Sequence, residues 1–386
     1  MHKSLSVVLA LSAQLGISSP TSNAISTCAR SMDGALPASP PSDFSFSGNV
    51  RRYYIAAEAV TWDYAPTGWD NALGVPLEYS PRARYGGVVG SGSLGTKWQK
   101  ALYRGYTDAS FSQLSPQPSW NGNNGPILRA EVGDMIEVMF VNKLSNIYAS
   151  MHSMGLAYNK DNEGSVYPNN TQPGQNVVVA PGSAVAPGGC VVYKWLVNEG
   201  AAPTKGTPSH MWGYHSYVSY EQDQNAGLTG NTIVYARGQM NSTMARHREF
   251  VLTYMQFDES FSSMSAANRA VLVQNGSSMP STHDNRTMWP SMQSTPGNQS
   301  VWQPQVTNFM AALNQLSSNQ APTFSAHNGF IYANGPPFEV CVNDPTIWYV
   351  SAYGNNPHVF HMHGNGFVYQ GQNLASIGMC PHLPAE

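Results

Sequence analysis

The sequence contains few charged residues. Only 11% of its 386 residues are Asp, Glu, Lys or Arg, against about a quarter in an ordinary soluble domain. The 19 basic and 22 acidic residues give a formal net charge of −3, so the chain lacks the basic surface that binds nucleic acid or acidic lipid. Disordered chains are rich in charge and poor in aromatics, whereas this one is 11% aromatic and 41% apolar. We therefore expect a folded protein that binds neither nucleic acid nor a membrane.

No apolar run is long enough to cross a membrane. The N-terminal run from Leu5 to Ile17 follows Lys3 and precedes the small residues Ser22 and Ala24. It is shorter than a membrane span, and this order of segments is typical of a secretory signal peptide with Ser22 and Ala24 at its −3 and −1 positions. We therefore expect residues 1–24 to be a signal peptide and the mature protein to be secreted; a buried N-terminal helix is the alternative.

Cysteine is also scarce, and no CxxC pair suggests zinc or redox chemistry. One or two disulfides are expected among Cys28, Cys190, Cys341 and Cys380. Five Asn-X-Ser/Thr sequons indicate a glycoprotein, which agrees with secretion. They lie at Asn169, Asn241, Asn275, Asn285 and Asn298.

Short apolar runs separated by Gly, Pro, Asn and Ser clusters predict an all-β protein. The predicted strands lie at 51–64, 177–182, 190–197, 229–236 and 248–260, with more in 324–369. The run 126–144 contains a Gly133-Asp134 turn and predicts a hairpin or meander. We expect two β-sandwich domains, 25–245 and 246–386, the second incomplete. A Ser/Asn-rich insertion at about 261–322, with a short helix near 306–316, interrupts the second domain.

The segment HVFHMHG carries the strongest chemical signal in the chain. On a strand, His361 and His363 point to one face and His358 to the other. Imidazole is a common ligand of copper, zinc and iron. Three histidines within six residues therefore predict a metal site; a polar surface strand is the alternative.

Two upstream segments each hold one histidine beside a possible soft or phenolic ligand. His152 shares a strand face with Met154, and His215 shares one with Tyr217. We expect His210 in a loop, with a spare ligand as the alternative. His247, His283 and His327 have no partner in the sequence, and we expect them to face solvent.

Several segments together resemble the multicopper oxidases, in the branch of ceruloplasmin and the A domains of the clotting cofactors. They are GPILRAEVGDMIEVMFVNKL with MHSMGLAYNKDNEGSVYPNNT, CVVYKWLV with WGYHSYVSYEQDQNAGLTGNTIVYARG, REFVLTYMQFDES, and HNGFIYANG through HVFHMHGNGF. The resemblance implies cupredoxin-like Greek-key β-sandwiches with copper as cofactor. It also implies one-electron oxidation of a phenol-like organic substrate or a metal ion, coupled to reduction of dioxygen.

The resemblance assigns a role to each candidate ligand. His358 would bind the type 1 copper, which accepts electrons from the substrate. His361 and His363 would bind the trinuclear cluster, joined by His152 and His215 from the first domain.

The sequence also departs from the family pattern. Met154 and Tyr217 each stand where a family motif has its second histidine. The family's closing HCHxxxH segment does not follow HVFHMHG; Cys380 is followed by Pro381, and the resemblance fades after about Gly378 as in a truncated chain. Two alternatives to an active oxidase therefore stay open: a non-catalytic cupredoxin-like protein, and a protein with one mononuclear copper site. A homo-oligomer is a further possibility.

Overall fold

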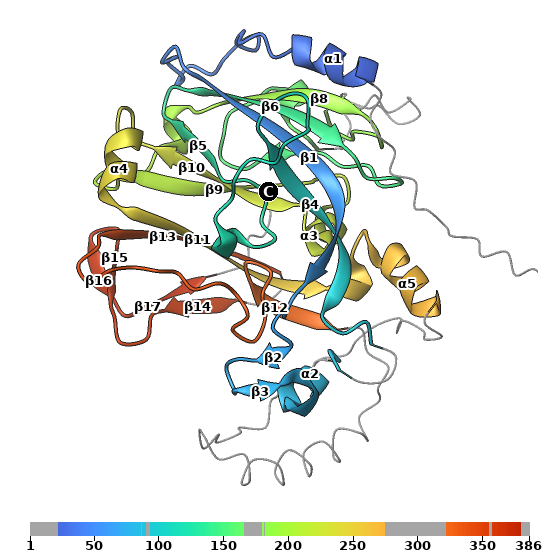
Figure 1. The fold of residues 1–386 in the computed structure, drawn as a ribbon. Helices are drawn as coiled ribbons and strands as arrows, with labels where there is room; N and C mark the ends of the chain where they lie inside the picture. Colours follow the sequence, from blue (N-terminus) through green and yellow to red (C-terminus); the bar gives the residue numbers. More distant parts are fainter. Residues whose placement is uncertain are drawn as a thin grey trace, which may run out of the picture.

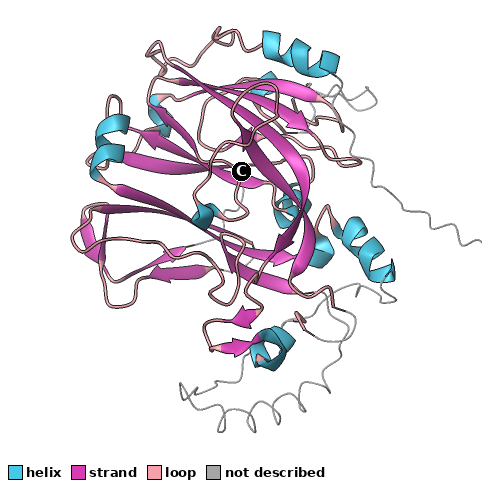
Figure 2. Cartoon of the chain, in the orientation of Figure 1, coloured by secondary structure: helices cyan, strands magenta, loops and turns pink. Residues whose placement is uncertain are grey.

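A computed structural model of the chain describes residues 22–85, 87–89, 93–165, 180, 182–274, 322–354 and 357–379. Strands dominate, with short helices at the edges of the sheets (Figure 2). The all-β prediction is therefore confirmed. The predicted helix near 306–316, most of the predicted strand 177–182, four of the five sequons and Cys380 lie outside the described residues.

The first unit is a sandwich of two four-stranded sheets (Figure 1). One sheet has the order β4 (Lys97–Tyr106), β1 (Val50–Asp63), β6 (Met135–Asn142) and β8 (Cys190–Leu196). The other has the order β5 (Leu128–Glu131), β10 (Thr229–Tyr235), β9 (Ser209–His215) and β7 (His152–Ser153). Side chains from both sheets form one buried core, which includes Ile55, Phe140, Tyr193, Tyr214 and Val234.

The second unit has a three-stranded sheet with the order β12 (Thr323–His327), β11 (Arg248–Asp258) and β13 (Thr346–Tyr353). Four more strands form the pairs β14 (His358–His361) with β17 (Ser376–Met379), and β15 (Phe367–Tyr369) with β16 (Gln372–Leu374). The candidate ligands of HVFHMHG thus lie on or just after β14, beyond the three-stranded sheet.

Short elements connect the strands. The helices are α1 (Ser22–Arg30), α2 (Pro81–Tyr85), α3 (Tyr220–Ala226), α4 (Met240–Arg246) and α5 (Ser265–Gln274), and the small pair of strands is β2 (Trp69–Asp70) with β3 (Val75–Pro76). The 3-10 turns are η1 (Leu77–Tyr79), η2 (Ser119–Asn121), η3 (Lys160–Asn162), η4 (Glu199–Ala201) and η5 (Glu259–Phe261). None of the described helices is long and apolar enough to cross a membrane.

The hairpin or meander predicted at 126–144 is wrong. Both of its strands exist as β5 and β6, but β5 pairs with β10 in one sheet while β6 pairs with β1 and β8 in the other. Gly133, with φ of +97°, lies between them, in a conformation that glycine adopts without steric cost. The turn is therefore a corner between the two sheets.

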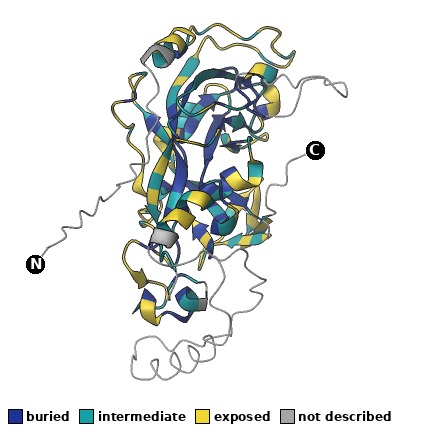
Figure 3. Ribbon diagram, turned by 90° about the vertical axis from the view of Figure 1, so that its right-hand side faces the viewer, coloured by how far each residue is buried: buried dark blue, intermediate teal, exposed yellow. Residues whose placement is uncertain are grey.

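The two units share a core. Tyr64, directly after β1, and Trp98 of β4 are buried in one cluster with Phe257, Phe324 and other side chains of the second unit. Dark-blue buried segments accordingly continue from the upper sandwich into the lower unit in Figure 3. The sequence boundary at residue 245 therefore does not separate two independent cores.

A disulfide joins Cys28 of α1 to Cys190, the first residue of β8. Ile25, Cys28 and Ala29 of α1 pack against residues of β1 and β6, so this helix covers part of the first sheet. The expected cleavage point between Ala24 and Ile25 lies within α1 and upstream of the disulfide. Cys341 is exposed and forms no disulfide with the cysteines that the structure describes.

Candidate metal centre

The first pair of candidate ligands comes from neighbouring strands. His152 of β7 and His215 of β9 are directly opposite in the antiparallel register, and their ring centroids lie 5.4 Å apart. Tyr217 completes a triangle, with its ring 5.1 Å from His152 and 5.4 Å from His215. Sequence positions more than sixty residues apart thus supply one compact group of two imidazoles and a phenol.

Hydrogen bonds fix the tautomer of both imidazoles. His152 Nδ1 donates to the carbonyl oxygen of Glu163 at 2.7 Å, and His215 Nδ1 donates to that of Ser216 at 3.0 Å. A carbonyl only accepts, so the neutral rings carry their lone pair on Nε2. Burial lowers the pKa of His152 below its ordinary value of 6.5, partly offset by the hydrogen bond to Glu163. His152 is therefore neutral near pH 7, as metal binding requires.

Met154, directly after β7, lies beside β9. Its amide donates to the Gly213 carbonyl of β9 at 2.9 Å. A Cβ built on Gly213 would lie 3.3 Å from the Met154 sulfur. The thioether therefore covers Gly213, two residues before His215.

The second pair lies at the end of β14. The rings of His361 and His363 are 4.9 Å apart, and both side chains are exposed. β14 ends at His361, so His363 belongs to the turn that follows. The sequence correctly placed these two imidazoles together and His358 apart from them.

His358 packs instead on Tyr254 of β11, with ring centroids 3.7 Å apart. Its Nε2 is buried and has no hydrogen-bond partner within the described residues, and burial lowers its pKa. His327 of β12 also contacts Tyr254, with ring centroids 5.3 Å apart. Desolvation and then the neighbouring His358 lower the pKa of His327.

Sequence reasoning missed this contact of His327. The residue was expected to face solvent without a partner, and it is indeed exposed, but its ring packs on Tyr254. The contact arises from the register that pairs Tyr254 with His327 across β11 and β12. A pairing between strands that distant carries no local sequence signal.

The pairs do not combine into a larger cluster. Across the part of the chain that the structure describes, no three His, Cys, Asp or Glu side chains are grouped so as to hold a metal ion. The donor sets fit copper as two separate imidazole pairs, since imidazole nitrogen is a suitable copper ligand. They do not fit a complete trinuclear cluster.

Comparison with known proteins places the chain in a family, although no family model matches it. It is 31% identical to Ferroxidase HEPHL1 of Mus musculus over 339 residues, which cover 86% of this chain and 26% of that protein. Human ceruloplasmin is 29% identical over 349 residues, covering 86% of this chain and 29% of ceruloplasmin. The venom prothrombin activator omicarin-C non-catalytic subunit of Oxyuranus microlepidotus is also 29% identical, over 87% of this chain and 20% of that subunit.

Among solved structures, a blue copper oxidase from Nitrosomonas europaea covers 86% of this chain and 73% of its own, with a TM-score of 0.46 and 13% identity. That likeness is too weak to add to the assignment, which the sequence relatives and the two-sheet sandwich carry. The protein is a cupredoxin-type β-sandwich protein. It belongs to the ceruloplasmin-like branch of the multicopper oxidases, whose cofactor is copper. The chain spans 20–29% of the length of these three relatives.

Proposed function

We propose that this chain is a secreted copper oxidoreductase that oxidises a metal ion or a phenol-like substrate with dioxygen as the acceptor. The observation that carries the proposal is the presence of two imidazole pairs, His152 with His215 and His361 with His363, one in each unit. Relatives named ferroxidase and ceruloplasmin support the choice of reaction.

The residues of this chain would act as ligands and as a rigid support. His152 and His215 come from paired strands of a packed sandwich, and their Nδ1 atoms are held by carbonyls. Such hydrogen bonds to the nitrogen that does not face the metal fix the orientation of an imidazole ligand before the metal binds. Bound copper would supply one-electron transfer; the chain's part is to hold the ligands in place.

His358 would bind a separate copper. Its Nε2 is a buried polar atom without a hydrogen-bond partner among the described residues, and such atoms are costly unless something binds them. Tyr254 holds the ring from one side. A buried imidazole nitrogen in this position is suited to bind a metal ion.

Location outside the cell agrees with three features. They are the apolar N-terminal segment, the Cys28–Cys190 disulfide and the exposed sequon residue Asn241 at the start of α4. Disulfides form and persist in oxidising compartments. We propose that the mature protein begins near Ile25, which retains Cys28.

Copper stoichiometry of the purified secreted protein tests the proposal, together with dioxygen uptake in the presence of Fe²⁺ or a phenol. We expect copper to be bound and dioxygen to be consumed, and the double variant His361→Ala/His363→Ala to bind less copper than wild type while keeping the copper held by His152 and His215. His210→Ala is the matched control, because His210 lies on β9 outside both pairs and its loss should leave the copper content unchanged.

Two outcomes would contradict the proposal. Protein that binds no copper would be a non-catalytic cupredoxin scaffold, the alternative that Met154 and Tyr217 favour. Protein that binds copper but consumes no dioxygen would be a copper-binding protein without oxidase activity.

A further inference from the structure

We infer that Tyr217 supplies a phenolate ligand to a copper ion held by His152 and His215, so that the first sandwich carries a mononuclear Cu(II) site of its own. This inference rests on the proposal that the two imidazoles bind copper. It goes beyond that proposal because it replaces a share in a trinuclear cluster by a closed site with a different donor set.

The first support is the geometry of the three rings. The centroid distances of 5.4, 5.1 and 5.4 Å make a nearly equilateral triangle. Nitrogen and oxygen ligands lie about 2.0–2.2 Å from a metal of this kind, so two ligand atoms of one ion lie within about 4 Å of each other. Rings at these separations are close enough to share one ion.

The second support is that one short segment, residues 163–165, contacts both His152 and Tyr217. The Glu163 carbonyl accepts from His152 Nδ1, and Ser165 forms a β-bridge with Tyr217. Ser150 adds a third tie, because its hydroxyl accepts from the Tyr217 amide at 3.0 Å and donates to the Gly164 carbonyl at 2.5 Å. Residues 163–165 therefore fix the distance between the imidazole and the phenol.

The third support is enclosure by other aromatic rings. Tyr158 lies 5.6 Å from His152, and Tyr220 lies 4.9 Å from His215 and 5.0 Å from Tyr217. His215 is only 2% exposed. These rings limit access of further ligands, and the described residues offer no third His, Cys, Asp or Glu at the site. The group of His152, His215 and Tyr217 therefore has room for one metal ion.

The chemistry of the donor set favours the oxidised ion. On binding, the phenol releases its proton to solvent, and its anionic oxygen joins two neutral imidazoles. The resulting Cu(II) complex carries one positive charge fewer than a site with a third imidazole would. An anionic oxygen donor stabilises Cu(II) over the softer Cu(I), so the reduction potential should be lower than in the variant Tyr217→His.

The experiment uses the full chain freed of metal and carrying His358→Ala/His361→Ala/His363→Ala, so that none of the other proposed copper ligands contributes. Addition of one equivalent of CuSO₄ should produce a visible phenolate-to-Cu(II) charge-transfer band and a single EPR signal. Tyr217→Phe should abolish the band and weaken copper binding at least tenfold. Tyr217→His should keep the copper, lose the band and raise the reduction potential.

Tyr220→Phe is the matched control, because it removes a phenol of the same aromatic group that lies outside the triangle. It should keep both the band and the affinity. Circular dichroism and thermal melting establish that each variant is folded. Copper binding without the band, or a band that survives Tyr217→Phe, would overturn this inference and leave the proposed function standing. No copper at His152 and His215 would overturn both.

Discussion

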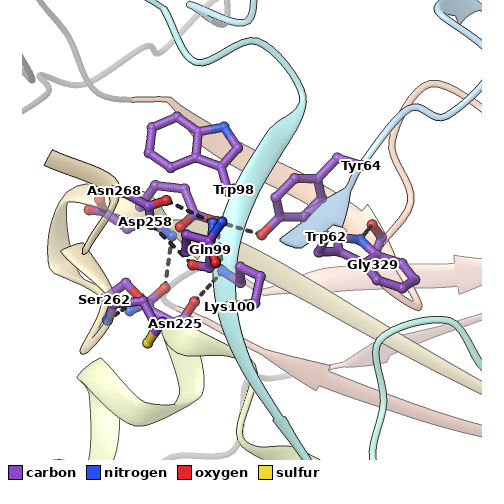
Figure 4. A network of polar contacts seen from close by, with 12 residues as sticks. Trp62, Tyr64, Trp98, Gln99, Lys100, Asn225, Asp258, Ser262, Asn268 and Gly329 are labelled. Carbon is purple, nitrogen blue, oxygen red and sulfur yellow. Dashed lines mark hydrogen bonds and ion pairs between the residues drawn. The ribbon is translucent and has the colours of Figure 1, made fainter. Parts of the chain in front are cut away.

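The ammonium of Lys100 donates to Glu259 Oε1 over 2.6 Å, and both side chains are completely buried. Lys100 belongs to β4 of the first unit and Glu259 to η5, directly after β11 of the second. Tyr64 donates to the same carboxylate oxygen at 2.5 Å, and Lys100 also donates to the Asn225 carbonyl at 2.6 Å. Figure 4 shows Tyr64, Lys100 and Asn225 meeting at this point. The network ties the two units together.

Breaking this ion pair on one side should be more harmful than removing it whole. Lys100→Met leaves the Glu259 carboxylate buried without its cation, and we expect a loss of about 3–5 kcal/mol in the free energy of unfolding. The double variant Lys100→Met/Glu259→Gln removes both charges and should recover much of that loss. Denaturant unfolding of wild type, both single variants and the double variant gives the coupling energy. Additive losses would show that the pair does not act as a unit.

Metal-free protein should lose stability as the pH falls below about 6.5. Burial keeps the pKa of His152 below its ordinary value of 6.5, so the unfolded chain binds more protons between the folded and unfolded pKa values. The free energy of unfolding therefore rises with pH in that window, by at most about 1.4 kcal/mol per pH unit for one proton. The contribution of His152 to the free energy of unfolding is fully present above pH 6.5. It is lost as the pH falls towards the pKa that His152 has in the folded protein.

Urea midpoints measured in EDTA at pH 7.5, 6.5 and 5.5 test this. His152→Gln should have a shallower pH dependence than wild type, whatever its stability at pH 7.5. Equal slopes in the two proteins would show that His152 does not contribute to the acid sensitivity.

Gly122 is a position where a side chain should not fit. A Cβ there would lie 1.8 Å from the Asn328 carbonyl oxygen of the second unit, and its φ is +58°. Gly74 has φ of +71° with nothing within 4 Å of such a Cβ. Gly74→Ala should therefore lower the free energy of unfolding only by the cost of a positive φ in a residue with a Cβ, about 1–2 kcal/mol. Gly122→Ala should lower it clearly more. Thermal melting compares the two, and equal losses would mean that the loop moves to make room.

The Cys28–Cys190 disulfide should be present in the purified protein and should stabilise it. Peptide mapping without reduction should recover a peptide pair joining these two cysteines. Cys28→Ser/Cys190→Ser should lower the free energy of unfolding by about 2–5 kcal/mol. Recovery of Cys28 in another pairing, or its absence from the mature chain, would contradict the structure.

The sequence predicted individual strands well and their partners poorly. β1, β8, β10 and β11 were found because alternating or continuous apolar residues mark strands locally. The pairing of β5 and β6 was wrong because two adjacent strands can enter different sheets at a glycine corner, and nothing in 126–144 distinguishes that from a hairpin.

The candidate site shows the same division. Alternation along one strand predicted that His361 and His363 lie together; their rings are 4.9 Å apart, although β14 ends at His361 and His363 lies in the following turn. The meeting of His152 with His215 could be expected only from the family resemblance, since it depends on the register of β7 with β9. Whether these residues bind copper remains a prediction.

β1 extends from the first sandwich into the cluster around Tyr64, alongside β12 (Figure 1). A fragment that stopped at residue 245 would leave Tyr64 and Trp98 facing water, and a fragment that began there would lack two of its largest core side chains. Heating should therefore give one calorimetric peak and not two. If the second unit were replaced by that of another protein at residue 245, the hybrid would fold only if the end of β1 were replaced together with the second unit.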